Sequence, residues 1–149
     1  MGDVTTHFSR HEFRLPQDKA EEFGFSETPY PEEWVATRLR PLCMALEVLR
    51  DGLGGRPITP ISGYRPREYD AARIAAGHKG VSPTSLHNHG LAADIQVAGV
   101  APAKVREVAL RLHALKQVTW GGVGLYDDDF VHLDLRQILN GPGKLRLWP

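Results

Sequence analysis

The stretch DFVHLDLR at residues 129–136 limits the possible folds more than any other part of this sequence. Its polar and apolar residues alternate, and successive side chains of a β-strand point to opposite faces. One face would carry Val131, Leu133 and Leu135. The other face would carry Phe130, His132, Asp134 and Arg136. The pattern therefore predicts a strand with one face in the core and the other face toward a cleft or solvent.

A second unusual stretch is SLHNHGLAADIQV at residues 85–97, whose second half alternates like another strand. It holds His87, His89 and Asp94 within an otherwise apolar run. Two histidines and one carboxylate form a common catalytic zinc site, because three protein ligands leave the fourth tetrahedral position open for water. We expect His132 to be the third partner of His87 and Asp94. The same donors would also accept cobalt, nickel or copper.

The rest of the chain predicts an α+β fold with a small, mostly antiparallel sheet packed against helices. Leucines at positions 42, 46, 49 and 53 follow one helical face within residues 32–55, and a second apolar stripe predicts a helix over 101–116. Short β-like segments are expected at 56–62 and 118–126, and one short helix is expected within 66–84. Residues 1–33 are polar and are expected to be irregular. The length of 149 residues favours a single domain over residues 1–149.

Composition narrows the classes of partner. Lysine and arginine number 18 and aspartate and glutamate number 18, so no basic field is available to hold nucleic acid or an anionic membrane. The single cysteine, Cys43, excludes an intramolecular disulfide and any zinc site built from several cysteines. No apolar run has the length of a signal peptide or of a membrane span. We expect a monomer made in the cytoplasm, which would reach an external target only if released, injected or carried by a phage.

Three motifs together resemble a known enzyme family. The pattern Ser85-x-His87-x-x-Gly90-x-Ala92-x-Asp94 resembles the signature of the D-Ala-D-Ala carboxypeptidase and L-alanyl-D-glutamate endopeptidase family. SGYRP at 62–66 resembles the segment with that family's active-site arginine, and residues 121–136 resemble the segment with its last zinc histidine. HFSRHEF at 7–13 is similar to the opening of a small branch. The family's zinc enzymes share a fold with the hedgehog signalling domain and cut bacterial cell-wall peptides.

The resemblance implies a role for several residues. His87, Asp94 and His132 would bind zinc. Arg65 would hold the substrate carbonyl or carboxylate and stabilise the oxyanion, and Ser85 would help to position the substrate.

The catalytic base is less firmly placed. The family has an acid three residues before the last histidine, which is Asp129 here. Three consecutive aspartates leave that register open, and Asp134 is an alternative base because it shares a strand face with His132. Some carboxypeptidases of the family carry a further histidine two residues before the last ligand, where this chain has Phe130.

The sequence thus predicts a zinc metallopeptidase that hydrolyses peptidoglycan stem peptides, as a D-Ala-D-Ala carboxypeptidase or an endolysin-like endopeptidase. The alternative is a non-catalytic zinc-containing interaction module, for example in a phage tail.

Two further expectations concern packing. The glycines of GGVG at 121–124 are expected in turns, and Trp34, Trp120 and Trp148 are expected in the core.

Overall fold

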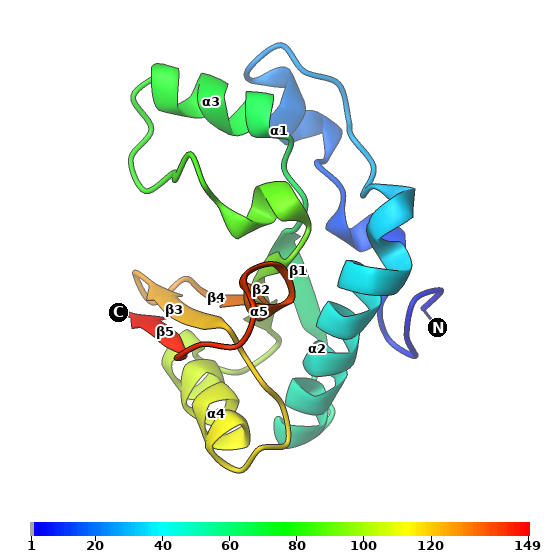
Figure 1. The fold of residues 1–149 in the computed structure, drawn as a ribbon, viewed down its shortest axis with the longest axis vertical. Helices are drawn as coiled ribbons and strands as arrows, with labels where there is room; N and C mark the ends of the chain where they lie inside the picture. The colour runs from blue at the N-terminus through cyan, green and yellow to red at the C-terminus, as the bar shows by residue number, and fades with distance from the viewer. Residues whose placement is uncertain (1) are drawn as a thin grey trace.

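The computed structural model describes residues 2–149 and contains a five-stranded sheet with the order β1-β2-β4-β3-β5 (Figure 1). Neighbouring strands are antiparallel except β3 and β5, which are parallel. The strands are β1 (Ile58–Ser62), β2 (Ala92–Val97), β3 (Gly122–Tyr126), β4 (Phe130–Asp134) and β5 (Arg146–Trp148). This arrangement confirms the predicted α+β class with a mostly antiparallel sheet.

The described residues form α-helices and shorter helical segments. The α-helices are α1 (Gln17–Glu21), α2 (Arg40–Gly52), α3 (Arg67–Ala75), α4 (Pro102–Ala114) and α5 (Gln137–Asn140). Shorter helical segments of other types are η1 (Arg10–Phe13), η2 (Glu32–Trp34), η3 (Val35–Leu39) and η4 (Leu86–His89). None of the helices within residues 2–149 is both long and apolar enough to cross a bilayer.

The hydrophobic core lies between the two long helices and one face of the sheet. The leucines at 42, 46 and 49 are buried on α2, and Val105, Val108 and Leu112 are buried on α4. The same cluster contains Val131 and Leu133 of β4, as the strand pattern predicted. Pro102 occupies the first turn of α4, where a missing backbone N–H costs nothing, whereas Pro41 lies where η3 continues directly into α2.

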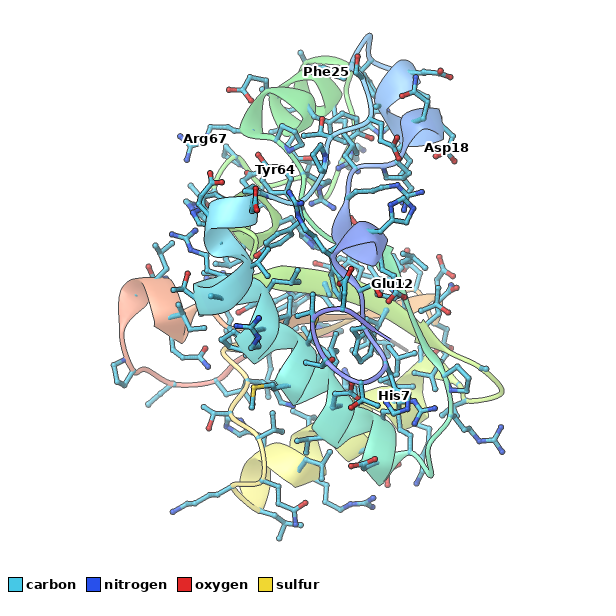
Figure 2. All side chains as sticks on the ribbon, turned by 90° about the vertical axis from the view of Figure 1, so that its right-hand side faces the viewer. His7, Glu12, Asp18, Phe25, Tyr64 and Arg67 are labelled. Atoms are coloured by element: carbon cyan, nitrogen blue, oxygen red, sulfur yellow. The ribbon has the colours of Figure 1, made fainter. Side chains whose placement is uncertain are left out.

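The N-terminal segment is more ordered than its sequence predicts. Phe8, Phe13 and Tyr30 are buried in the main core, and the Tyr30 hydroxyl donates a hydrogen bond to the Gly90 carbonyl at 2.6 Å. Figure 2 shows Phe25 at the end of the molecule where α3 lies, and its ring is 5.9 Å from that of Tyr69. These aromatic side chains follow no helical or strand period, so the pattern gave no sign of their burial.

Strand β3 corrects the expectation that the glycines of GGVG lie in turns. Gly122 and Gly124 sit inside the strand, opposite Asp134 and His132 of β4. On the other side of β3, Gly124 pairs with Trp148 of the unpredicted strand β5. A Cβ atom on Gly124 would overlap the Trp148 indole, and one on Gly122 would overlap the Asp134 carboxylate. Trp120 is buried in the core as expected, whereas Trp148 is only half-buried and lies on the opposite face.

The core assignment predicts unequal effects of two leucine truncations in the sheet. Leu133 is fully buried, so Leu133→Ala leaves a cavity and lowers the free energy of unfolding by about 2–5 kcal/mol. Leu147 is 57% exposed, so Leu147→Ala changes it by less than about 0.5 kcal/mol. Urea denaturation followed by circular dichroism measures both, and equal losses would contradict the placement of the core.

Candidate metal centre

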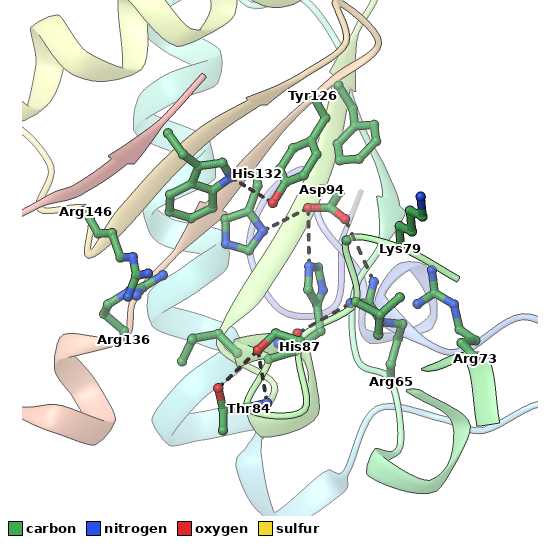
Figure 3. Close-up of a pocket in the computed structure, with 17 residues that line it drawn as sticks. Arg65, Arg73, Lys79, Thr84, His87, Asp94, Tyr126, His132, Arg136 and Arg146 are labelled. Atoms are coloured by element: carbon green, nitrogen blue, oxygen red, sulfur yellow. Dashed lines mark hydrogen bonds and ion pairs between the residues drawn. The ribbon is translucent and has the colours of Figure 1, made fainter. Parts of the chain in front are cut away.

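His87, Asp94 and His132 meet on the sheet face opposite the core. Strands β2 and β4 place Asp94 directly across from His132, and η4 brings His87 in just before β2 begins. Asp94 Oδ1 lies 3.0 Å from His132 Nδ1 and 3.3 Å from His87 Nε2 (Figure 3). One ligand atom from each residue lies within 4.8 Å of the other two, and all three residues are buried. The predicted three-residue cluster is therefore formed.

The other nitrogen of each imidazole is already engaged. His87 Nδ1 lies 2.8 Å from the Gly63 carbonyl oxygen, which can only accept a hydrogen bond. His132 Nε2 lies 2.9 Å from Asp134 Oδ2, which as a carboxylate also accepts. With a cation bound, these partners would keep one proton on each imidazole, and each histidine would turn an unprotonated nitrogen toward Asp94. The three facing atoms would then hold the cation, and two imidazoles with one carboxylate suit zinc.

Burial and mutual contact shift the pKa values of the three groups. Burial lowers the pKa of His87 and keeps it neutral. Burial would raise the pKa of Asp94, but His87 and His132 outweigh that effect and hold it well below its usual range. The pKa of His132 shifts in the opposite direction. Burial would lower it, but hydrogen bonds to Asp134 and Asp94 outweigh burial and raise it. The carboxylate is thus ionised at neutral pH, as a metal ligand requires.

Asp134, the alternative base, is paired with the Arg136 guanidinium. It is 0% exposed, and both of its oxygens accept hydrogen bonds from the Arg136 guanidinium, at 2.9 and 2.6 Å. Burial opposes ionisation, but His132 and Arg136 outweigh it and lower the pKa of Asp134 to about 2. A carboxylate held in this way orients His132 and has no free oxygen for a water molecule.

Asp129, the other candidate base, does not reach the metal centre. It is exposed in the turn between β3 and β4, and its Oδ1 accepts a hydrogen bond from Gln96 Nε2 at 2.9 Å. It borders a separate hollow, beside Pro102 and Val105 at the beginning of α4. Asp129 lies in the turn just before β4, and its partner Gln96 follows Asp94 by two residues on β2. Its role as the base stays a prediction.

Arg65 lies beside the ligands, as the sequence predicted. Its Nη1 is 3.9 Å from Asp94 Oδ2 and donates to Ser62 Oγ at 2.8 Å. Its Nη2 is 3.4 Å from the Oγ of Ser85, the predicted substrate-positioning residue. Its Nε donates to the buried carboxylate of Asp70 at 3.1 Å. Arg65 is therefore held in place before any substrate binds.

Asp70 is a buried partner of Arg65 that the sequence did not single out. Besides Arg65 it accepts hydrogen bonds from Arg73 and Asn88, each at 2.9 Å. A buried carboxylate with three donors indicates a support for the arginines. Its only sequence signal is its position one helical turn after SGYRP, which alone is too common to single it out.

The ligands form the floor of a cavity of about 440 Å³. Five cationic side chains line it, while Asp94 is the only carboxylate among its lining residues. The cations are Arg65, Arg73, Lys79, Arg136 and Arg146. The lining is thus basic, although Asp70 and Asp134 behind it pair with Arg65, Arg73 and Arg136. His89 does not line it, and its backbone carbonyl accepts a hydrogen bond from Arg38.

Comparison with known proteins identifies the family. The family model described as peptidoglycan L,D-endopeptidase MepK matches residues 38–141, which include His87, Asp94 and His132. The chain belongs to this peptidase family. The resemblance to zinc peptidases of the D-Ala-D-Ala type is thereby confirmed at the level of the family.

Two relatives show the extent of the similarity. The chain is 36% identical over 80 residues to the peptidoglycan L,D-endopeptidase MepK of Escherichia coli strain K12, covering 53% of this chain and 40% of that protein. It is 35% identical over 98 residues to a probable peptidoglycan L,D-endopeptidase MepK of Haemophilus influenzae, covering 65% of this chain and 45% of that protein. The chain therefore matches less than half the length of these relatives. No solved structure matches it significantly.

The contact between Asp134 and His132 predicts an effect on metal affinity. Asp134→Asn removes the charge behind His132 and should weaken zinc binding by about 10–100-fold. Competition with a chromophoric chelator measures the affinity. Asp128→Asn, in the exposed hairpin turn, is the matched control and should bind zinc like the wild type. Equal affinities for all three proteins would exclude a role of Asp134 in holding the ligand.

Proposed function

We propose that this chain is a zinc-dependent endopeptidase that cuts peptide bonds in the stem peptides of bacterial peptidoglycan. The observation that carries the proposal is the convergence of His87, Asp94 and His132 beside a pre-positioned Arg65. Membership of a family described as peptidoglycan L,D-endopeptidase MepK supports the same chemistry. The names of the relatives favour an internal bond between an L- and a D-residue over release of a terminal D-alanine.

The donor set supports zinc as the cofactor. Zinc held by His87, Asp94 and His132 would supply Lewis-acid chemistry, which polarises a carbonyl and lowers the pKa of a water molecule. Arg65 would orient the substrate by its carbonyl or carboxylate and stabilise negative charge as it develops. Ser85 would help to place the substrate, since its hydroxyl lies between Arg65 and the backbone N–H of His87.

The basic lining supports an acidic peptide as the substrate. Arg65, Arg73 and Lys79 lie on one side of the centre, and Arg136 and Arg146 lie on the other (Figure 3). A peptide with carboxylates on both sides of the scissile bond would gain attraction from each group. Cell-wall stem peptides have this chemistry, which an uncharged peptide lacks.

Neither predicted aspartate has the position of a free base. Asp129 lies outside the cavity, and Asp134 is buried under Arg136. We propose that this chain contributes mainly by orienting the substrate and stabilising negative charge, without proton transfer to either residue.

Digestion of peptidoglycan tests the proposed function. Purified protein is incubated with peptidoglycan and with defined stem peptides, with zinc and after chelation, and the products are identified by mass spectrometry. We expect about one zinc per chain and an internal cut that chelation abolishes. Release of D-alanine alone would contradict the endopeptidase assignment and show a carboxypeptidase. Stoichiometric zinc without any cleavage would favour the non-catalytic module.

The same assay tests the role of Asp129. From its position we expect Asp129→Asn to keep activity within about twofold of the wild type, whereas removal of a general base costs about 10²–10⁴-fold. Arg65→Ala is the comparison that should lose activity while it still binds zinc. A loss of activity in Asp129→Asn at unchanged zinc content would restore the base assignment.

The basic lining predicts a substrate effect at Arg146. Arg146 is exposed at the cavity rim, so Arg146→Gln should raise KM for an acidic peptide by about twofold to fivefold and leave kcat unchanged. The effect should shrink in high salt, because exposed charges are screened. Lys144→Gln is the matched control, since Lys144 borders a different hollow. Equal KM values for both variants would exclude a role of Arg146 in substrate binding.

A further inference from the structure

Two aromatic side chains of the cavity have no part in the roles assigned above. Tyr126 comes from β3 and Trp148 from β5, and both line the same cavity as the metal ligands. Both share the sheet face that carries His132, because Gly124 pairs with His132 on one side and with Trp148 on the other. The missing side chain of Gly124 is what lets the indole lie across β3.

A hydrogen bond joins the two side chains, and the chemistry of the indole determines which of them is the donor. Trp148 Nε1 lies 2.8 Å from the Tyr126 hydroxyl oxygen. An indole N–H can only donate, so the phenol oxygen accepts and its own proton must point elsewhere. Within residues 2–149 no protein acceptor is placed for that proton. The hydroxyl therefore presents a donor to whatever occupies the cavity.

Neighbouring rings hold this donor in place. Tyr126 stacks on Phe130 with the ring centroids 4.9 Å apart and the planes 10° apart. The Trp148 ring lies 5.0 Å from that of His132, and the Arg136 guanidinium lies 5.7 Å from the Trp148 ring. Figure 3 shows the Tyr126 hydroxyl beside Asp94 and His132, across the centre from Arg65. A fixed donor at a metal centre has the geometry that stabilises charge in a transition state.

We propose that Tyr126 is a further catalytic residue, whose hydroxyl donates a hydrogen bond to the scissile carbonyl oxygen as negative charge develops on it, and that Trp148 is its positioning residue. The inference rests on the proposed peptidase function. Arg65 and Tyr126 then approach the reacting carbonyl from opposite sides. No proton is transferred, so the phenol is unchanged after each turnover.

Removal of the single hydroxyl tests the proposal. Tyr126→Phe should lower kcat by about 10²–10³-fold, the usual effect of losing one such donor, with KM changed less than about threefold. Zinc content and melting temperature should equal those of the wild type. Tyr64→Phe is the matched control, because the Tyr64 ring packs against Tyr30 and Trp34 and does not line the cavity.

The positioning role of Trp148 has its own signature. Trp148→Phe keeps an aromatic ring but lets the Tyr126 hydroxyl rotate, so kcat should fall by about tenfold. Because both residues act through one hydrogen bond, the double variant should be no slower than Tyr126→Phe alone. If the loss of kcat in the double variant equalled the product of the two single losses, the positioning role of Trp148 would be overturned.

A binding measurement separates this inference from the proposed function. A phosphinate analogue of a stem peptide mimics the tetrahedral state, and calorimetry on zinc-loaded protein gives its affinity. Tyr126→Phe should lower the affinity for the phosphinate by about 10²-fold or more and leave the affinity for the product peptide unchanged. Unchanged phosphinate affinity and unchanged kcat would overturn the inference while the peptidase function stands. A wild type that cuts no wall peptide would overturn the proposed function and, with it, the catalytic role of Tyr126.

Discussion

The contact between His132 Nδ1 and Asp94 Oδ1 at the middle of the sheet is the interaction on which the rest of the site depends. It exists only because β2 and β4 pair with Asp94 opposite His132. A shift of β4 by one residue in that register would turn His132 into the core and Leu133 out of it. The apolar face against α2 and α4 therefore determines the position of the metal ligands as well as the stability of the fold.

Around this contact, each functional group has a support of its own. Gly63 and Asp134 fix the two imidazoles, Asp70 fixes Arg65, and Trp148 directs the Tyr126 hydroxyl. None of these supports requires a bound metal to form its hydrogen bonds. The site is thus largely assembled by the fold, which reduces the reorganisation needed when metal and substrate bind.

The sequence predicted those features that have a period or a motif. The alternation in 129–136 predicted both faces of β4, and the signature around His87 predicted the three ligands that the structure brings together. The family spacing assigns Asp129 as the base, and this role stays a prediction. The structure places Asp129 in the turn before β4, with Gln96 as its hydrogen-bond partner.

Other features depend on contacts between distant segments and had no local signal. Asp70 and Trp148 acquire their roles from partners on other elements, and β5 is only three residues long. The buried Phe8, Phe13 and Tyr30 lie in a segment without period. GGVG suggested turns because glycine favours them, whereas here the glycines make room for neighbouring side chains.

The two glycines of β3 carry a further consequence, which concerns the balance between stability and activity. Glycine inside a strand costs roughly 0.5–1 kcal/mol relative to alanine, so Gly122 and Gly124 together cost about 1–2 kcal/mol of folding free energy. No larger residue fits at either position, because a Cβ atom there would overlap Asp134 or Trp148. Strand β3 therefore gives up some stability so that two side chains of the site can lie against it.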